Sequence, residues 1–239
     1  MLLTLVIGAS AGIGRAFVEV ARSEGSVVAT VSRRATVGDH ALRIDLADPP
    51  NWLTVAGWFE SLVSAERWDR VDVLHAAATI EPIGPAGHVD AAAYQRNVLL
   101  NSAAPQVLGA ASVGILNRHG RTGCLMMLSS GAARTAYEGW SSYGAGKAAM
   151  DQWVRAVGAE QSRRPNPVVV LSVAPGVVAT AMQEQIRAAT PVRFPRVDRF
   201  RRLHEEGELA SADAVARRLW DLMHDPAAVN GDVIDLRTR

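Results

Sequence analysis

The stretch VIGASAGIGRAF, residues 6–17, joins a short apolar run to an amphipathic pattern near the start of the chain. Its three glycines, Gly8, Gly12 and Gly14, permit a tight turn and let the backbone and a helix N-terminus approach a pyrophosphate closely. The spacing is G-x-x-x-G-x-G, and no Lys-Ser or Lys-Thr pair follows it, which disfavours a phosphate-transferring P-loop. A strand before these glycines and a helix after them predict a nucleotide-binding turn that begins an α/β fold.

Outward from this turn, apolar runs of strand length alternate with longer helical patterns. Continuous apolar runs are typical of strands buried on both faces of a parallel sheet. The alternation predicts a doubly wound parallel sheet with helices on both faces, whose strand carboxyl ends bind ligands. The expected strands lie within residues 2–8, 26–32, 41–45, 71–78, 123–130, 168–176 and 231–236, and the expected helices at about 14–24, 51–66, 90–117, 142–162 and 211–224, the last capped by Ser211.

The composition indicates one α/β domain, residues 1–239, with a large core. Hydrophobic residues make up 49% of the chain and the net charge is +1, so we expect no general attraction to nucleic acid or membrane. The single cysteine, Cys124, excludes an internal disulfide framework and a cysteine-rich metal site. We therefore expect no metal, a buried strand position for this thiol, and a reducing cytoplasm. The N-terminus lacks the basic region of a signal peptide, and no apolar run reaches the ~20 residues that span a bilayer.

Residues 184–210 interrupt the alternation of strands and helices. They contain two prolines and six arginines, and they follow the carboxyl end of an expected strand. A solvated surface excursion and a substrate lid both fit a segment of this kind. We expect a loop or small helical lid over the site.

The end of the second expected strand bears on the choice of cofactor. An acidic residue there would accept from the ribose 2′-hydroxyl and select NAD, but the sequence has Ser32, Arg33 and Arg34. Arginine can clamp a 2′-phosphate with paired donors, so the turn favours NADP(H), with a solvated basic turn as the alternative. After the third strand, Asp45 and Leu46 are expected near the adenine ring, although aspartate at a strand end is also a common turn former.

Tyr143 and Lys147 are spaced to share one face of an expected helix. A phenol titrates near about 10, and an adjacent ammonium would lower that pKa toward neutrality. Tyr143 could then protonate a carbonyl oxygen as hydride reaches its carbon, and Lys147 could bind the nicotinamide ribose. Such pairs also occur by chance on many helices. Ser130 strengthens the interpretation, because a hydroxyl at a strand end could hold the substrate oxygen, while Ser129 would point the other way.

Together, Gly8-x-x-x-Gly12-Ile13-Gly14, Ser130, Tyr143-x-x-x-Lys147 and Pro175-Gly176 resemble the short-chain dehydrogenase/reductase family over essentially the whole chain. The resemblance implies a Rossmann-like, seven-stranded parallel sheet in three α/β/α layers, a nicotinamide cofactor, and a homodimer or homotetramer. The stretches at residues 139–151 and 175–187 look most like the sepiapterin reductase and benzil reductase group. Enzymes of that group reduce ketones next to another carbonyl with NADPH.

The resemblance also implies roles for further residues. Asn101, chosen over Asn97 because small residues follow it, would support a proton-relay water near the lysine. Val178 would meet the cofactor carboxamide through its backbone and Thr180 through its hydroxyl, or Thr180 would merely cap a helix. The implied cofactor-binding residues are Gly8, Ser10, Ile13, Gly14, Ser32, Arg33, Arg34, Asp45, Leu46, Ala76, Ala77, Tyr143, Lys147, Pro175, Gly176, Val178 and Thr180.

The chain departs from the family pattern at two places. Ile7 stands where threonine is frequent, and His75-Ala76-Ala77-Ala78 replaces the usual Asn-Asn-Ala-Gly, which puts local rigidity and cofactor affinity in question. His75 could be taken for a base, but we expect it to pack at a strand end. Candidate substrate contacts near the strand ends and the catalytic helix are Glu81, Tyr137, Trp140 and Met182.

The sequence thus favours NADPH-dependent reduction of a ketone or vicinal dicarbonyl, a small-molecule carbonyl substrate. In that reaction Tyr143 would be the general acid, Lys147 its partner, Ser130 the oxygen ligand and Asn101 the relay support. Two other hypotheses remain: an NAD-dependent alcohol or polyol dehydrogenase, for which Arg33 and Arg34 would be idle, and a non-catalytic NADP(H) sensor on the same fold.

Overall fold

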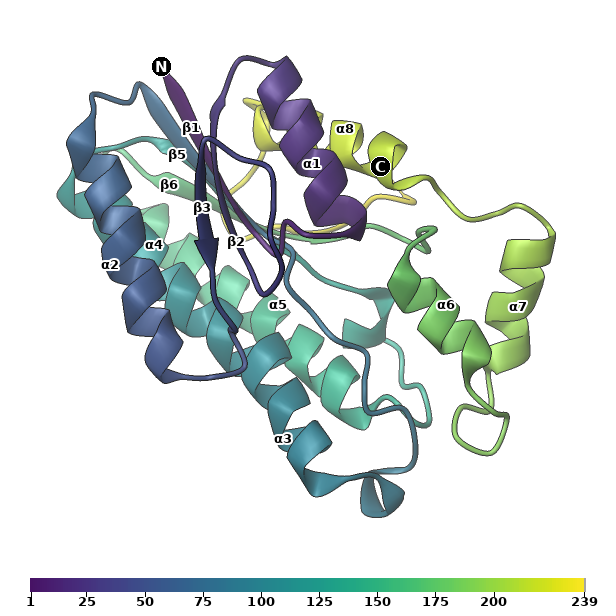
Figure 1. Ribbon diagram of the computed structural model, residues 1–239. Coiled ribbons are helices and arrows are strands. Elements are labelled where there is room, and N and C mark those ends of the chain that lie inside the picture. The colour runs from purple at the N-terminus through teal and green to yellow at the C-terminus, as the bar shows by residue number, and fades with distance from the viewer. Residues whose placement is uncertain (239) are drawn as a thin grey trace.

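The computed structural model describes residues 1–238 and has a seven-stranded parallel sheet at its centre (Figure 1). The strand order is β3-β2-β1-β4-β5-β6-β7, and every neighbouring pair is parallel, which confirms the predicted doubly wound sheet. The strands are β1 (Leu2–Ile7), β2 (Val27–Ser32), β3 (His40–Arg43), β4 (Arg70–His75), β5 (Gly123–Leu128), β6 (Val168–Ala174) and β7 (Val233–Asp235).

Helices cover both faces of the sheet. In Figure 1, α2, α4 and α5 lie on one face and α1 and α8 on the other. Residues of β1, β4 and β5 are almost all buried, as expected for strands enclosed on two sides. The helices are α1 (Gly12–Ser23), α2 (Pro50–Ala65), α3 (Ala91–Val98), α4 (Ala104–Arg118), α5 (Ser141–Gln161), α6 (Ala181–Ala188), α7 (Val197–Glu205) and α8 (Ala212–Met223).

Local chemistry explains where two of these elements begin or end. Ser211 Oγ accepts a hydrogen bond from the backbone of Ala214, so it caps α8 as predicted. Strand β3 ends at Arg43, two residues before its predicted end, because Asp45 Oδ1 accepts from the amide of Ala47 and turns the chain away from the sheet. Cys124 is fully buried in β5, as predicted.

Helices α3 and α4 form one continuous run with a π-helical turn, Leu99–Ala103, between them. This run, Ala91–Arg118, is long and apolar enough to cross a membrane by length and composition alone, which the sequence analysis did not anticipate. Half of its most apolar window is buried inside the protein, and α4 packs against α2 and strand β5. Burial in the core accounts for its apolar character.

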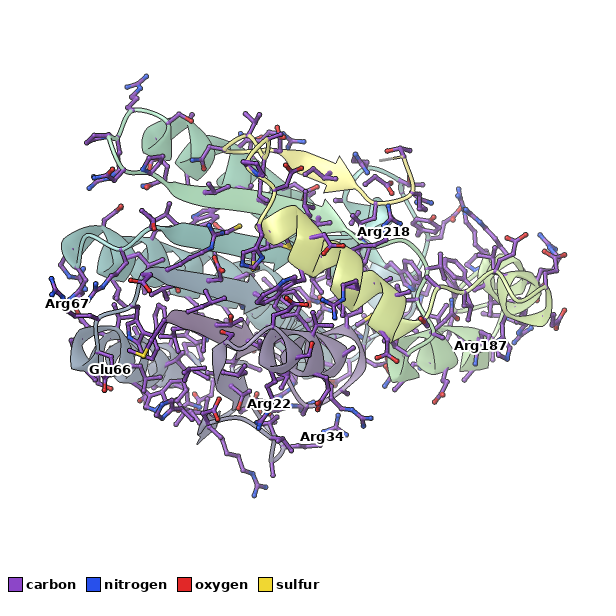
Figure 2. All side chains as sticks on the ribbon, turned by 90° about the horizontal axis from the view of Figure 1, so that it is seen from above. Arg22, Arg34, Glu66, Arg67, Arg187 and Arg218 are labelled. Atoms are coloured by element: carbon purple, nitrogen blue, oxygen red, sulfur yellow. The ribbon has the colours of Figure 1, made fainter. Side chains whose placement is uncertain are left out.

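The segment at residues 184–210 contains helical structure. It includes most of α6 and all of α7, two helices that pack on each other and lie beyond the end of the sheet in Figure 1. In Figure 2, Arg187 of α6 marks this projecting part of the molecule. Apart from the two apolar layers that flank the sheet, a separate cluster of buried side chains joins α6 and α7 to the start of α5. It includes Ile80, Trp140, Tyr143, Ile186, Phe194, Val197 and Phe200.

Candidate active site

The glycine turn after β1 brings three chain segments into close contact. Gly8 has a φ of 93°, and a Cβ atom there would lie 2.4 Å from the backbone nitrogen of Ala77. A Cβ atom on Gly14 would lie 2.2 Å from the carbonyl oxygen of Gly8. No side chain caps the N-terminus of α1, so its first amides face the turn without a side-chain acceptor. This arrangement fits a bound pyrophosphate, because only glycine leaves the backbone accessible there.

A groove of about 320 Å³ runs from this turn past the end of β2. Beside it lies a cavity of about 270 Å³ at the start of α5. Six residues line both hollows, so the two form one continuous site at the strand carboxyl ends. These six are Ile13, Ala76, Ala78, Leu128, Thr180 and Met182. Of the predicted cofactor residues, Gly8, Ser10, Ile13, Gly14, Ser32, Arg33, Arg34, Asp45, Leu46, Ala76, Ala77 and Thr180 line the groove. Tyr143, Lys147, Pro175, Gly176 and Val178 line the cavity.

One end of the groove is basic. Ser32 donates its hydroxyl proton to the carbonyl oxygen of Arg34 over 2.5 Å, so this side chain shapes the turn. Arg33 and Arg34 are exposed, and neither forms an ion pair with a carboxylate within residues 1–238; the guanidinium of Arg34 reaches only Ser10 Oγ, at 3.5 Å. Figure 2 shows Arg34 at the periphery, on the same side as Arg22. These two guanidinium groups are therefore free to bind an anion.

Asp45 and Leu46 line the same groove beside the basic turn, and Arg33 helps to stabilise the charged Asp45. Arg96 Nη2 donates to Asp45 Oδ2 over 2.6 Å, a contact that joins this turn to α3. Partial burial opposes ionisation, but the hydrogen bonds from Arg96 and Ala47 outweigh it and hold the pKa of Asp45 below its usual range. Asp45 is thus both a turn former and a groove residue, and Arg96 is a partner that sequence reasoning missed.

The structure brings Ser130, Tyr143 and Lys147 together around the cavity. Ser130 follows β5 and caps a short 3-10 turn, where its Oγ accepts from the amide of Ala132. Tyr143 lies in the first turn of α5, and Lys147 follows one turn later. Lys147 Nζ donates to the carbonyl oxygen of Leu128 over 2.6 Å and lies 5.8 Å from the centre of the Tyr143 ring.

The expected effect of Lys147 on the Tyr143 phenol is wrong for this structure. Burial raises the pKa of Tyr143, and the hydrogen-bonding interaction with Ser130 offsets this only in part. The side chains of Tyr143 and Lys147 are nearly inaccessible to solvent, which disfavours the charged form of each. Burial likewise lowers the pKa of Lys147 to about 8, with Asp151 opposing the shift. The phenol therefore remains protonated near neutral pH, the form in which it can donate a proton.

Asn101 lies in the π-helical turn, fully buried, and its side chain is committed to structure. Its Oδ1 accepts from the amide of Thr79 at 3.0 Å, and its Nδ2 donates to the carbonyl of Thr79 at 2.7 Å and to Asn97 Oδ1 at 2.8 Å. Asn101 also packs closely against α5, because a Cβ atom on Gly146 would lie 2.9 Å from Asn101 Cβ and 3.3 Å from the Asn101 carbonyl oxygen. Gly146 directly precedes Lys147, so this contact places Asn101 beside the turn that carries the lysine.

Replacing Asn101 with alanine is expected to destabilise the fold by about 1–3 kcal/mol, because buried backbone groups of Thr79 lose their partners. Chemical denaturation would measure the change. Asn117→Ala is the matched control, since Asn117 makes no side-chain hydrogen bond within residues 1–238. Equal losses in the two variants would contradict an anchoring role for Asn101.

The turn after β6 leaves hydrogen-bonding groups open to the cavity. The neighbours of Val178 are fixed, since Ala179 donates to Ala210 and Ala210 donates to Val177, but Val178 itself makes no backbone hydrogen bond in the described chain. Thr180 occupies the N-cap position of α6, yet its side chain makes no capping bond. Helix capping therefore does not explain the Thr180 hydroxyl, and both residues fit the predicted binding of a carboxamide.

His75 packs at the end of β4, as expected. Its side chain is 3% exposed, and burial lowers its pKa to about 3, so the ring is neutral. It lines neither hollow. In the altered segment that follows, the amide of Ala76 donates to the carbonyl of Ile7 over 2.7 Å, so a backbone bond joins β1 to the segment after β4.

The cavity wall is mainly apolar and aromatic. Tyr137, Trp140 and Met182 line it as predicted, whereas Glu81 does not; its carboxylate instead accepts from the backbone of Ile83. Phe194 stacks on Trp140 with ring centres 4.4 Å apart, so residues distant in sequence support the wall. Sequence reasoning missed several lining residues, because the segment after β4, α6, α7 and the C-terminal turn contribute them; they include Ile80, Gln183, Ile186, Arg199, Phe200 and Arg237.

Comparisons with known proteins agree with this architecture. A family model described as short chain dehydrogenase matches residues 3–191. A benzil reductase ((S)-benzoin forming) from Bacillus subtilis is 32% identical over 99% of both chains, and one from Bacillus cereus is 29% identical over 98% of both. The crystal structure of a short chain dehydrogenase/reductase from Saccharomyces cerevisiae aligns with a TM-score of 0.84 at 23% identity, over 98% of this chain and 96% of that one.

Proposed function

The chain belongs to the short-chain dehydrogenase family, and from that premise we propose that it reduces a ketone or vicinal dicarbonyl to the hydroxy compound with NADPH. The convergence of Ser130, Tyr143 and Lys147 on one apolar cavity, continuous with the glycine-turn groove, is the observation that carries this proposal. The two benzil reductases, similar over nearly their whole length, support a dicarbonyl as substrate.

The dinucleotide, when bound, supplies the hydride. Ser130 Oγ binds the substrate oxygen and directs it toward Tyr143. The buried phenol of Tyr143 holds its proton near neutral pH and donates it to that oxygen as charge develops there. Lys147 lies one turn away and lines the same cavity, where its Nζ would bind the nicotinamide ribose. Its bond to Leu128 holds the side chain in place.

The cavity wall suits an aromatic substrate. Trp140, Tyr137 and Phe200 offer ring faces and edges, and the tilted ring pairs among them leave a largely apolar hollow. We propose that residues 184–210 act as a lid, because side chains of α6 and α7 form part of this wall. Closure of such a lid would exclude water from the reacting carbonyl.

The function is tested by following NADPH oxidation with benzil and related ketones. Turnover yielding the hydroxy ketone is the expected result. Tight NADPH binding with no turnover on any diketone would favour the non-catalytic sensor. Turnover restricted to alcohols with NAD would favour the polyol dehydrogenase.

NADPH preference is expected to depend on Arg33. Because its guanidinium is exposed at the groove and forms no ion pair within residues 1–238, Arg33→Ala should raise the Kd for NADPH about tenfold or more and leave NADH binding unchanged. Titration of the cofactors by calorimetry measures both constants. Arg22→Ala, which removes an exposed arginine of α1 outside the groove, is the control. A parallel loss of NADH affinity would contradict recognition of the 2′-phosphate.

We also propose that the protein is a homodimer or homotetramer, as the family resemblance implies. Exposed apolar side chains on the helical layer, Leu53, Val98 and Val107, are compatible with a partner surface. Light scattering coupled to size exclusion would determine the state.

A further inference from the structure

The cavity beside Tyr143 contains positive charge and no carboxylate. Three lining residues are basic, Lys147, Arg199 and Arg237, and none of the lining residues is aspartate or glutamate. Lys147 is bonded to the carbonyl of Leu128 deep in the site. The two arginines therefore decide whether the outer part of the cavity attracts an anion.

Arg237 is already paired. Its Nε and Nη2 donate to the two carboxylate oxygens of Asp235 at 2.9 and 2.6 Å, and its stem packs over Gly176. These hydrogen bonds, opposed by some burial, hold the pKa of Asp235 at about 2, so the pair is charged at neutral pH. Arg134 donates to the same carboxylate. Arg237 is thus largely neutralised.

Arg199 is not paired with an acid. It projects from α7, and its Nη1 donates to the hydroxyl oxygen of Tyr137 over 3.3 Å, its one side-chain hydrogen bond within residues 1–238. Nearby arginines differ in this respect, since Arg196 pairs with Glu138 and Arg201 with Asp198. Arg199 is therefore an arginine of this lid segment that lines the cavity and forms no ion pair within residues 1–238.

Tyr137 completes a site with two donors. Its oxygen accepts from Arg199, which leaves the phenolic proton available to a ligand. Its ring lies 4.9 Å from Trp140 and 6.1 Å from Phe200, so aromatic carbon flanks the phenol on the inner side, while Arg199 approaches it from the exposed side. An apolar wall of this kind strengthens a charged hydrogen bond, because it excludes water from one side.

We propose that the preferred substrates are aromatic ketones or vicinal dicarbonyls bearing a carboxylate remote from the reacting carbonyl, held by Arg199 and Tyr137. This inference rests on the proposed reductase function and narrows its substrate class. In this arrangement the reacting carbonyl binds Ser130 and Tyr143, and the aromatic rings of the substrate pack along the apolar wall. The carboxylate accepts hydrogen bonds from Arg199 and the Tyr137 hydroxyl.

Benzil-4-carboxylate and its methyl ester test this proposal, because they differ chiefly in charge. The wild-type kcat/KM is expected to favour the acid by about tenfold or more at low ionic strength. Arg199→Gln should abolish the preference by lowering kcat/KM for the acid, with the ester unchanged, and Arg199→Lys should restore part of it. Arg202→Gln is the matched control, since Arg202 is exposed on the same helix but does not line the cavity.

Calorimetric titration of both compounds into protein saturated with NADP⁺ supplies a readout without turnover. The anion site is supported if the wild type binds the acid more tightly than the ester, and if this difference is lost in Arg199→Gln and kept in Arg202→Gln. If that binding result holds but neither compound is reduced, only the proposed reductase function is contradicted. Reduction of both compounds with no charge preference in wild type, or equal losses on acid and ester in Arg199→Gln, would overturn the inference and leave the function intact.

Discussion

Tyr143→Phe is expected to lower kcat/KM for benzil by about 10²–10⁴-fold, the usual contribution of a positioned general acid. The phenol lies at the cavity, and burial keeps it protonated, so its removal leaves the developing alkoxide without a proton donor. NADPH binding should persist, because most of the groove is formed by other residues. Steady-state kinetics measures the loss, and cofactor titration measures the retained binding.

Tyr94→Phe is the control for the loss of a phenolic hydroxyl. Tyr94 OH contacts Ser141 Oγ at 3.3 Å, but Tyr94 lines neither the groove nor the cavity. Its activity should match wild type. A Tyr143→Phe protein that retains full activity would exclude the proposed mechanism.

Gly8→Ala is expected to have the second large effect, on both stability and cofactor affinity. The φ of 93° costs an L-residue about 1–2 kcal/mol, and the added methyl would meet the backbone of Ala77 at 2.4 Å, which adds about 1–3 kcal/mol of overpacking. Any shift that relieves the contact widens the pyrophosphate cradle. Denaturant midpoints and NADPH titration would report the two effects separately.

Gly25→Ala is the control that separates the cost of a positive φ from the cost of the steric contact with Ala77. Gly25 has a similar φ of 78°, but a Cβ atom there meets nothing within 4 Å. This control should show the conformational cost alone and leave NADPH affinity unchanged. Equal losses of stability in the two variants, with normal NADPH binding by Gly8→Ala, would contradict the prediction. The close contact between Gly8 and the segment after β4 would then contribute to neither stability nor cofactor affinity.

The fold was largely predictable from the sequence. Buried parallel strands require continuous apolar runs, and each of the seven runs became a strand of the sheet. The glycine turn, the Ser130–Tyr143–Lys147 set and the turn at Pro175 lie together because parallel strands end at the same edge. The resemblance to the benzil reductase group was confirmed by relatives that span the whole chain.

Several properties of the site were not predictable. Burial reversed the expected pKa shift of Tyr143, since desolvation depends on everything packed around the phenol. The side chain of Asn101 turned out to anchor Thr79, and Asp45 turned out to pair with Arg96, because both partners depend on how α3 meets the sheet. Glu81 was expected at the substrate and lies outside the cavity.

The sequence by itself determined the order of strands and helices along the chain, the glycine turn and the identities of the reactive side chains. It could do so because periodicity and turn chemistry are local. Tertiary structure alone decided which groups are left without partners. Arg199 and Arg237 are both arginines near the cavity, yet one is neutralised by Asp235 and the other is not. That difference depends on distances between elements far apart in sequence, and it sets the charge at the outer part of the cavity that Tyr143 also lines.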